Sequence, residues 1–165
     1  MRRIAAILAC ALLVFQVASA GAAIGAYALE LPEGFALVEG EALEGYRQAA
    51  ENDAGSAFDG EVLLALNGGK SISIVVSASG ALDATQAAEA IVKEYAEYIP
   101  GFESVVPEAV EIAGRAFVRL HFAVDGDIAS QYFLTDGGAL YVFTFMGMED
   151  AEAEVALLGF TPAEQ

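Results

Sequence analysis

The side chains best suited to chemistry lie in the second half of the chain. The sole histidine is there, with an arginine, a serine and two tyrosines; these candidate residues are Arg119, His121, Ser130, Tyr132 and Tyr141. Imidazole, guanidinium and phenol groups among aromatic rings are typical of a ligand-binding face. Whether they meet depends on strand pairing, because successive side chains of a strand point to opposite faces.

Asp-Gly sequences separate the strands that carry these residues, and Asp-Gly is a strong hairpin signal. With two or four residues in the first loop, Arg119 faces Tyr132 and His121 faces Ser130. The same geometry at the second loop sets Tyr132 opposite Tyr141. One face then carries all five candidates, while a three-residue loop would move one strand to the other face. A purely structural role explains the same pattern. In that case Arg119 lies over the tyrosine rings at the margin of the sheet, and His121 is a half-buried residue whose hydrogen bonds are satisfied.

Other familiar motifs fail on spacing. Gly69-Lys70-Ser71 resembles the end of a phosphate-binding loop but lacks the earlier glycine and precedes a strand. Asp125-Gly126-Asp127 lacks the alternating acids of a calcium loop. No Gly-x-Ser-x-Gly sequence occurs, and one histidine with one cysteine cannot build a common zinc site. We therefore predict no catalytic residue, no metal ligand and no cofactor.

The composition excludes further classes of protein. The chain has 165 residues, 24 Asp and Glu against 7 Lys and Arg, and a formal charge of −17. Such an acidic surface is unsuited to nucleic acid or anionic lipid. Hydrophobic residues make up 56% of the chain, which excludes intrinsic disorder and indicates one compact domain.

The N-terminus has the pattern of a secretory signal peptide. Met1-Arg2-Arg3 is basic, an apolar stretch follows, and Ala18-Ser19-Ala20 supplies small residues before a cleavage site between Ala20 and Gly21. Cleavage would remove the sole cysteine and two arginines, leaving 24 acidic residues against 5 basic ones. The pattern predicts a protein of the periplasm, cell envelope or extracellular medium, with no membrane contact once it is cleaved.

Two alternatives to this cleavage remain open. The uncharged stretch from Ile4 to Leu29 is long enough to stay in the membrane as an anchor. Ile7-Leu8-Ala9-Cys10 resembles a lipobox, which would make Cys10 a lipid-modified N-terminus.

The exported chain divides into a flexible lead at 21–31 and a single α+β domain at 32–165. Strands are expected at 35–38, 61–66, 71–77, 110–112, 116–124, 128–135 and 139–146. Residues 39–60 are polar and predict a long surface connection, and no clear strand follows Phe160. Strands and helices do not alternate, so the sheet is antiparallel, with about six or seven strands and two helices.

The clearer helix follows Asp83. That residue and Gln86 form a capping-box pattern, and Pro100-Gly101 ends the helix. A short acidic helix begins at Glu149-Asp150 and reaches Leu158, before Gly159.

The second half of the chain is similar to PsbP-like and DcrB-like exported proteins. The similarity rests on the segments Ile112 to Phe122, Gln131 to Leu134 and Gly138 to Phe145. The resemblance covers about residues 31–160 and implies an α-β-α sandwich built on an antiparallel sheet. It implies an accessory or binding role and supplies no catalytic residue.

The sequence therefore favours an exported, non-catalytic binding domain with an unidentified protein or small-molecule partner. Two alternatives are a hydrolase with an unrecognised carboxylate or Ser/His site, and an acidic protein that binds divalent cations weakly.

Overall fold

A computed structural model describes residues 22–54, 60–77, 83–99, 101–124 and 126–163. The predicted signal peptide, its cleavage site, Cys10 and Asp125 lie outside these residues. The fold is α+β, as predicted from the sequence, and its elements in chain order are β1 (Ala22–Ile24), β2 (Tyr27–Leu29), β3 (Ala36–Leu37), α1 (Glu41–Ala54), β4 (Glu61–Asn67), β5 (Lys70–Ser77), α2 (Ala84–Tyr98), β6 (Glu108–Ile112), β7 (Arg115–Val124), β8 (Asp127–Asp136), β9 (Ala139–Met146), α3 (Asp150–Leu158) and β10 (Phe160–Pro162).

Seven strands form the main sheet in the order β3-β4-β5-β9-β8-β7-β6, and every pair is antiparallel. A second, smaller sheet has the order β1-β2-β10. The predicted strand number is confirmed. The predicted helix number is wrong, because α1 is a third helix within the segment expected to be a surface connection.

The segment expected to be a flexible lead also differs from the prediction. Residues 22–29 form the hairpin β1–β2, in which Ile24, Tyr27 and Leu29 are buried. β10 pairs with β2, although no strand was expected after Phe160. Tyr27 stacks on Phe160 with 4.3 Å between ring centroids, so aromatic packing joins the two ends of the domain.

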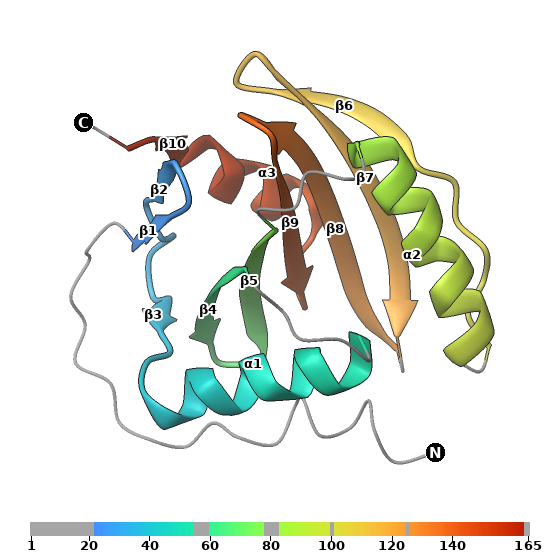
Figure 1. Cartoon of the computed structure of the whole chain (residues 1–165), viewed down its shortest axis with the longest axis horizontal. Coiled ribbons are helices and arrows are strands. Elements are labelled where there is room, and N and C mark those ends of the chain that lie inside the picture. The colour runs from blue at the N-terminus through green and yellow to red at the C-terminus, as the bar shows by residue number, and fades with distance from the viewer. Residues whose placement is uncertain (1–21, 55–59, 78–82, 100, 125, 164–165) are drawn as a thin grey trace.

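Two hydrophobic clusters lie on opposite faces of the main sheet. The larger contains the ring side chains of Phe117, Tyr132, Tyr141 and Phe143 and is covered by α3 and the small sheet. The smaller contains Leu120, Phe122 and Phe133 and is covered by α2. Figure 1 shows α2 alongside β7, α1 running past β4, and the small sheet at the opposite edge from α2.

The α2 helix begins as predicted. The Asp83 side chain accepts a hydrogen bond from the Gln86 backbone at 2.8 Å, and the Gln86 side chain accepts one from the Asp83 backbone at 3.3 Å. This reciprocal capping satisfies two amide groups that a helix start otherwise leaves unpaired.

Candidate functional site

The five candidate residues lie on one side of the main sheet, as predicted. β7 and β8 pair with Arg119 opposite Tyr132 and His121 opposite Ser130. The predicted pairing of β8 with β9 is wrong by two residues, because Tyr132 lies opposite Phe143, and Tyr141 lies opposite Leu134. A shift of two preserves the face of every side chain.

The loop between β8 and β9 explains this shift. It consists of Gly137 and Gly138, with φ of 57° and 82°, between the paired residues Asp136 and Ala139. A two-residue type I′ turn needs positive φ at both central positions, which two glycines supply more readily than Asp-Gly.

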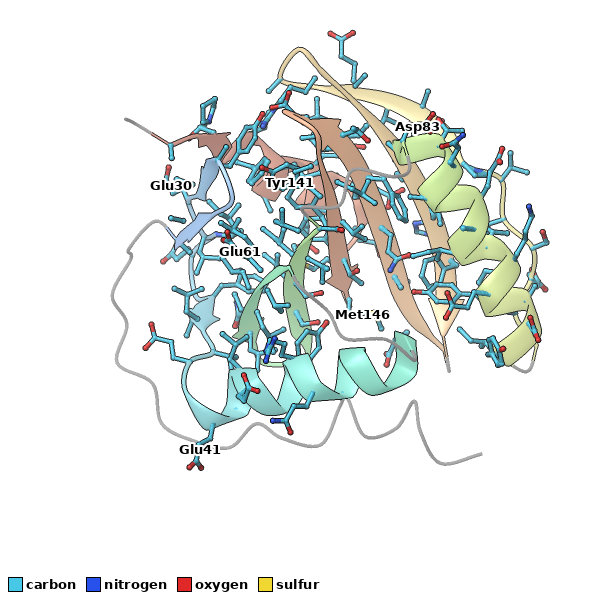
Figure 2. The ribbon with its side chains drawn as sticks, in the orientation of Figure 1. Glu30, Glu41, Glu61, Asp83, Tyr141 and Met146 are labelled. Carbon is cyan, nitrogen blue, oxygen red and sulfur yellow. The ribbon has the colours of Figure 1, made fainter. Side chains whose placement is uncertain are left out.

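The shared face is closed by α3 and the small sheet. Ser130 and Tyr132 are fully buried and Tyr141 is 2% exposed. Figure 2 shows Tyr141 beside the small sheet, where the Ala26 amide donates a hydrogen bond to its hydroxyl at 3.3 Å. The two tyrosines and the serine therefore belong to the packed core, and only Arg119 and His121 of the five reach the surface.

The polar groups of this face converge on Asp150 in the first turn of α3. His121 Nδ1 lies 2.9 Å from Asp150 Oδ1, and the hydroxyl of Ser130 donates a hydrogen bond to the same oxygen. Arg119 Nη1 lies 3.1 Å from Asp150 Oδ2. Burial raises the pKa of Asp150, but the hydrogen bonds from Ser130 and His121 and the charges of His121 and Arg119 outweigh it, so its pKa is below the usual value.

Arg119 links α3 to the edge strand β6. Its guanidinium lies 2.6 Å from Glu108 and 3.1 Å from Glu154, and its side chain is 18% exposed. The hydrogen bond to Glu108 and the nearby charge of Asp150 raise the pKa of Arg119. Tyr132 lies beside this guanidinium, and burial raises the pKa of its phenol to about 12. This cluster of charges fixes α3 over the sheet.

The Ser130, His121 and Asp150 contacts differ from those of a catalytic triad. In a triad, the serine and the carboxylate contact different imidazole nitrogens. Here Ser130 Oγ, at 3.2 Å, and Asp150 both lie next to Nδ1. Ser130 is also fully buried, so its hydroxyl is inaccessible to a substrate.

Sequence reasoning missed Asp150, because all five candidate residues lie on strands and none of them is acidic. Asp150 follows β9 closely and begins the last helix, where a carboxylate also stabilises the helix dipole. The signal available in the sequence was an acidic helix start directly after the strand that completes the aromatic face.

We expect the two core tyrosines to respond differently to loss of their hydroxyls. Among the described residues the buried hydroxyl of Tyr132 has no hydrogen-bond partner, so Tyr132→Phe leaves no group unpaired and should not lower the free energy of unfolding. Tyr141→Phe removes the acceptor of the Ala26 amide and should cost about 1 kcal/mol. Urea unfolding of both variants measures the difference; equal losses would contradict these hydroxyl assignments.

An open groove lies along the outer side of α3. Its volume is about 370 Å³, and the residues that line it are Pro32, Glu33, Phe35, Asn67, Lys70, Met148, Ala151, Glu152 and Val155. We call it the α3 groove. Across it, Lys70 Nζ lies 2.7 Å and 2.9 Å from the two carboxylate oxygens of Glu152, so this ion pair joins the β4–β5 hairpin to α3.

Close backbone packing fixes the walls of the α3 groove. The turn at Pro32 closes with a hydrogen bond from the Phe35 amide to the Pro32 carbonyl at 3.2 Å, and Gly34 has φ of 85°. A Cβ on Gly34 would lie 2.8 Å from the Asn67 side chain, and one on Gly147 would lie 2.8 Å from the Gly69 carbonyl. The turn and the hairpin therefore lie closer to their neighbours than a side chain at either glycine would allow.

The described residues contain no group of three or more His, Cys, Asp or Glu side chains placed to hold a metal ion. Among the same residues, no helix is long and apolar enough to cross a membrane.

No protein-family model matches the sequence, and no curated protein matches it. Solved structures do match. Cyanobacterial PsbP (CyanoP) from Synechocystis sp. PCC 6803 superposes with a TM-score of 0.55 and 14% identity, over 84% of this chain and 87% of that chain. This similarity extends over nearly the whole of both chains.

Two further bacterial structures match with lower scores. A protein of unknown function from Pseudomonas aeruginosa, PA94, described as a putative regulator, has a TM-score of 0.44 and 17% identity, over 58% of this chain and 74% of that chain. A protein from Bacteroides thetaiotaomicron has a TM-score of 0.47 and 15% identity, over 85% of this chain and 46% of that chain. The superposition on CyanoP, together with the seven-stranded antiparallel sheet and its helices, shows that this chain has a PsbP-like fold.

Proposed function

We propose that this protein is an exported, non-catalytic accessory domain that works by binding a partner. The observation that carries the proposal is the makeup of the α3 groove. The groove is open and partly apolar, and its lining residues include no hydroxyl, thiol or imidazole. Of its two carboxylates, Glu152 is paired with Lys70, which leaves Glu33 without the second carboxylate that glycosidase chemistry needs. Its one amine, on Lys70, is held in the ion pair with Glu152. These groups suit binding better than covalent chemistry.

The test combines an activity screen with crosslinking. Wild-type protein, Ser130→Ala and His121→Asn are assayed on glycosides, esters and peptides, and we expect no turnover that distinguishes them. Calorimetry with calcium is expected to show no saturable binding in the micromolar range. Turnover abolished by one substitution, or saturable calcium binding, would overturn the non-catalytic assignment in favour of a hydrolase or a cation-binding protein.

Crosslinking tests the binding role. A photoreactive amino acid replaces Val155, which lines the groove, or Val106, which is 85% exposed and does not line it. In the extracytoplasmic fraction of a producing host, position 155 should give a discrete adduct and position 106 should not. Absence of any adduct at position 155 counts against a groove-mediated binding role.

Export has its own prediction. Intact-mass measurement of protein recovered outside the cytoplasm should give a chain that begins at Gly21, because small residues precede that position. A chain that begins at a lipidated Cys10, or one that keeps Met1, would show that the protein is a lipoprotein or a membrane-anchored protein instead.

A further inference from the structure

We propose that the α3 groove binds a basic segment of a partner protein that carries an apolar anchor side chain. This inference rests on the binding function proposed above and adds the place of binding and the chemistry of the partner. Three features of the groove support it: an exposed apolar stripe, carboxylates at its margin, and walls that are already fixed.

The apolar stripe lies on the outer side of α3. Ala153, Ala156 and Leu157 face the core and are buried. Val155 and Leu158 are nevertheless 64% and 55% exposed, which makes the short helix apolar on both sides. With Ala151, these two residues have the spacing of one helical face. Exposed apolar surface next to a groove is typical of a protein-binding site.

Two exposed carboxylates, those of Glu33 and Glu30, lie near this stripe. Glu33 lines the groove, is exposed, and makes no hydrogen bond or ion pair within the part of the chain that the structure describes. Glu30 is exposed next to Gly159, directly after the helix. Among the described residues that line the groove, Lys70 is the one basic residue, and Glu152 neutralises it.

Charge complementarity therefore selects a basic partner. The protein carries a formal charge of −17, so two copies repel one another and a second copy is a poor occupant of the groove. A segment with Lys or Arg on either side of an apolar side chain would place its charges near Glu30 and Glu33. Its anchor would lie against Val155 and Phe35.

The walls of the groove do not have to move for this segment to bind. A side chain at Gly34 would collide with Asn67, and one at Gly147 would collide with the Gly69 carbonyl, so the turn and the hairpin lie close against their neighbours. The Lys70–Glu152 ion pair joins the hairpin to α3. A site formed before binding loses little conformational entropy on association.

The probe is a fluorescein-labelled synthetic peptide in which Leu and Phe are flanked by Lys and Arg. Its affinity for the complete mature protein is measured by fluorescence anisotropy. Val155→Asp should weaken binding at least about tenfold, because it places a charge where the anchor docks. Val106→Asp adds the same charge away from the groove and should leave affinity unchanged. A peptide with Ser in place of Leu and Phe should bind at least about tenfold more weakly.

A second pair of variants tests the acidic margin. Glu33→Lys should weaken binding about threefold to tenfold, whereas Glu89→Lys changes the net charge equally on α2 and should have less than about a twofold effect. Raising the salt concentration from about 50 to 300 mM should weaken binding to the wild-type protein. Thermal unfolding of each variant checks that the fold is retained.

Each contrary result identifies a different error. Equal losses in Glu33→Lys and Glu89→Lys would mean binding to the general negative field, which overturns the docking site. Self-association in sedimentation that Val155→Asp abolishes would make a second copy the occupant. If the peptide fails to bind while position 155 still forms an adduct in the crosslinking experiment, the binding function stands and the basic partner is wrong.

Discussion

Replacing Arg115 with methionine should lower the free energy of unfolding by about 3 kcal/mol, because it removes charged hydrogen bonds and ring contacts together. Arg115 Nη2 donates to the carbonyl of Leu157 at 3.3 Å and to the carbonyl of Phe160. Its guanidinium also lies 5.2–5.7 Å from the ring centroids of Tyr27, Phe117 and Phe160. The side chain therefore joins the end of α3 to β10 and the small sheet.

Urea unfolding measures this loss, and two variants serve as comparisons. Arg115→Lys keeps the charge but lacks the planar group that reaches both carbonyls, so it should recover less than half of the loss. Lys93→Met removes the charge of an exposed side chain on α2 and should change stability by less than about 0.5 kcal/mol. Hydrogen exchange of the Ala163 amide, which donates to the Ala26 carbonyl, should accelerate in Arg115→Met. A loss below about 1 kcal/mol would show that Arg115 does not hold the small sheet.

The second large effect is expected at Asp150. Asp150→Ala removes the carboxylate on which Ser130, His121 and Arg119 converge, and it should cost about 2–3 kcal/mol at pH 7. Arg119 keeps its contacts with Glu108 and Glu154, which limits the loss. Chemical unfolding at neutral pH measures the effect.

The pKa of Asp150 gives this prediction a pH dependence. Because the pKa is lower in the folded protein than in the unfolded chain, Asp150 stabilises the fold above the unfolded value, about 3.9. That stabilisation is lost as the pH falls through the folded pKa. The stability difference between wild type and Asp150→Asn should therefore shrink as the pH is lowered below about 4. Glu89→Gln is the matched control. If the stability difference between wild type and Asp150→Asn did not change with pH, the ionised carboxylate of Asp150 would not be the form that stabilises the fold.

The main sheet was largely predictable from local sequence. Residues 108–146 alternate and are punctuated by glycine turns, so the strands, their order and their faces follow from short-range rules. The α2 start was equally clear, because its capping box involves residues only three apart. The one error of register, between β8 and β9, came from choosing Asp-Gly over Gly-Gly as the turn.

The missed elements have weak local signals. α1 is rich in charged and small residues, contains Gly45, and has only partly buried side chains such as Leu43 and Tyr46 among those described. β1, β2 and β10 have three residues each, too few for a periodic pattern. They exist because segments from the two ends of the domain meet, which short-range patterns do not encode.

The candidate site was predictable in its grouping but not in its environment. Pairing rules placed Arg119, His121 and the tyrosines on one face. They could not show that α3 and the small sheet cover that face, since this depends on how the chain returns after β9. The α3 groove was not predicted, because it is lined by residues from three separate parts of the chain.

The small sheet sets the order in which the molecule is completed. Its central strand, β2, is among the first parts of the domain to be synthesised, and its partner β10 is among the last. Tyr27 and Leu29 therefore have no Phe160 to pack against until translation has passed the end of α3. A nascent chain that stops before β10 lacks this closure, so the small sheet is completed only once β10 has been synthesised.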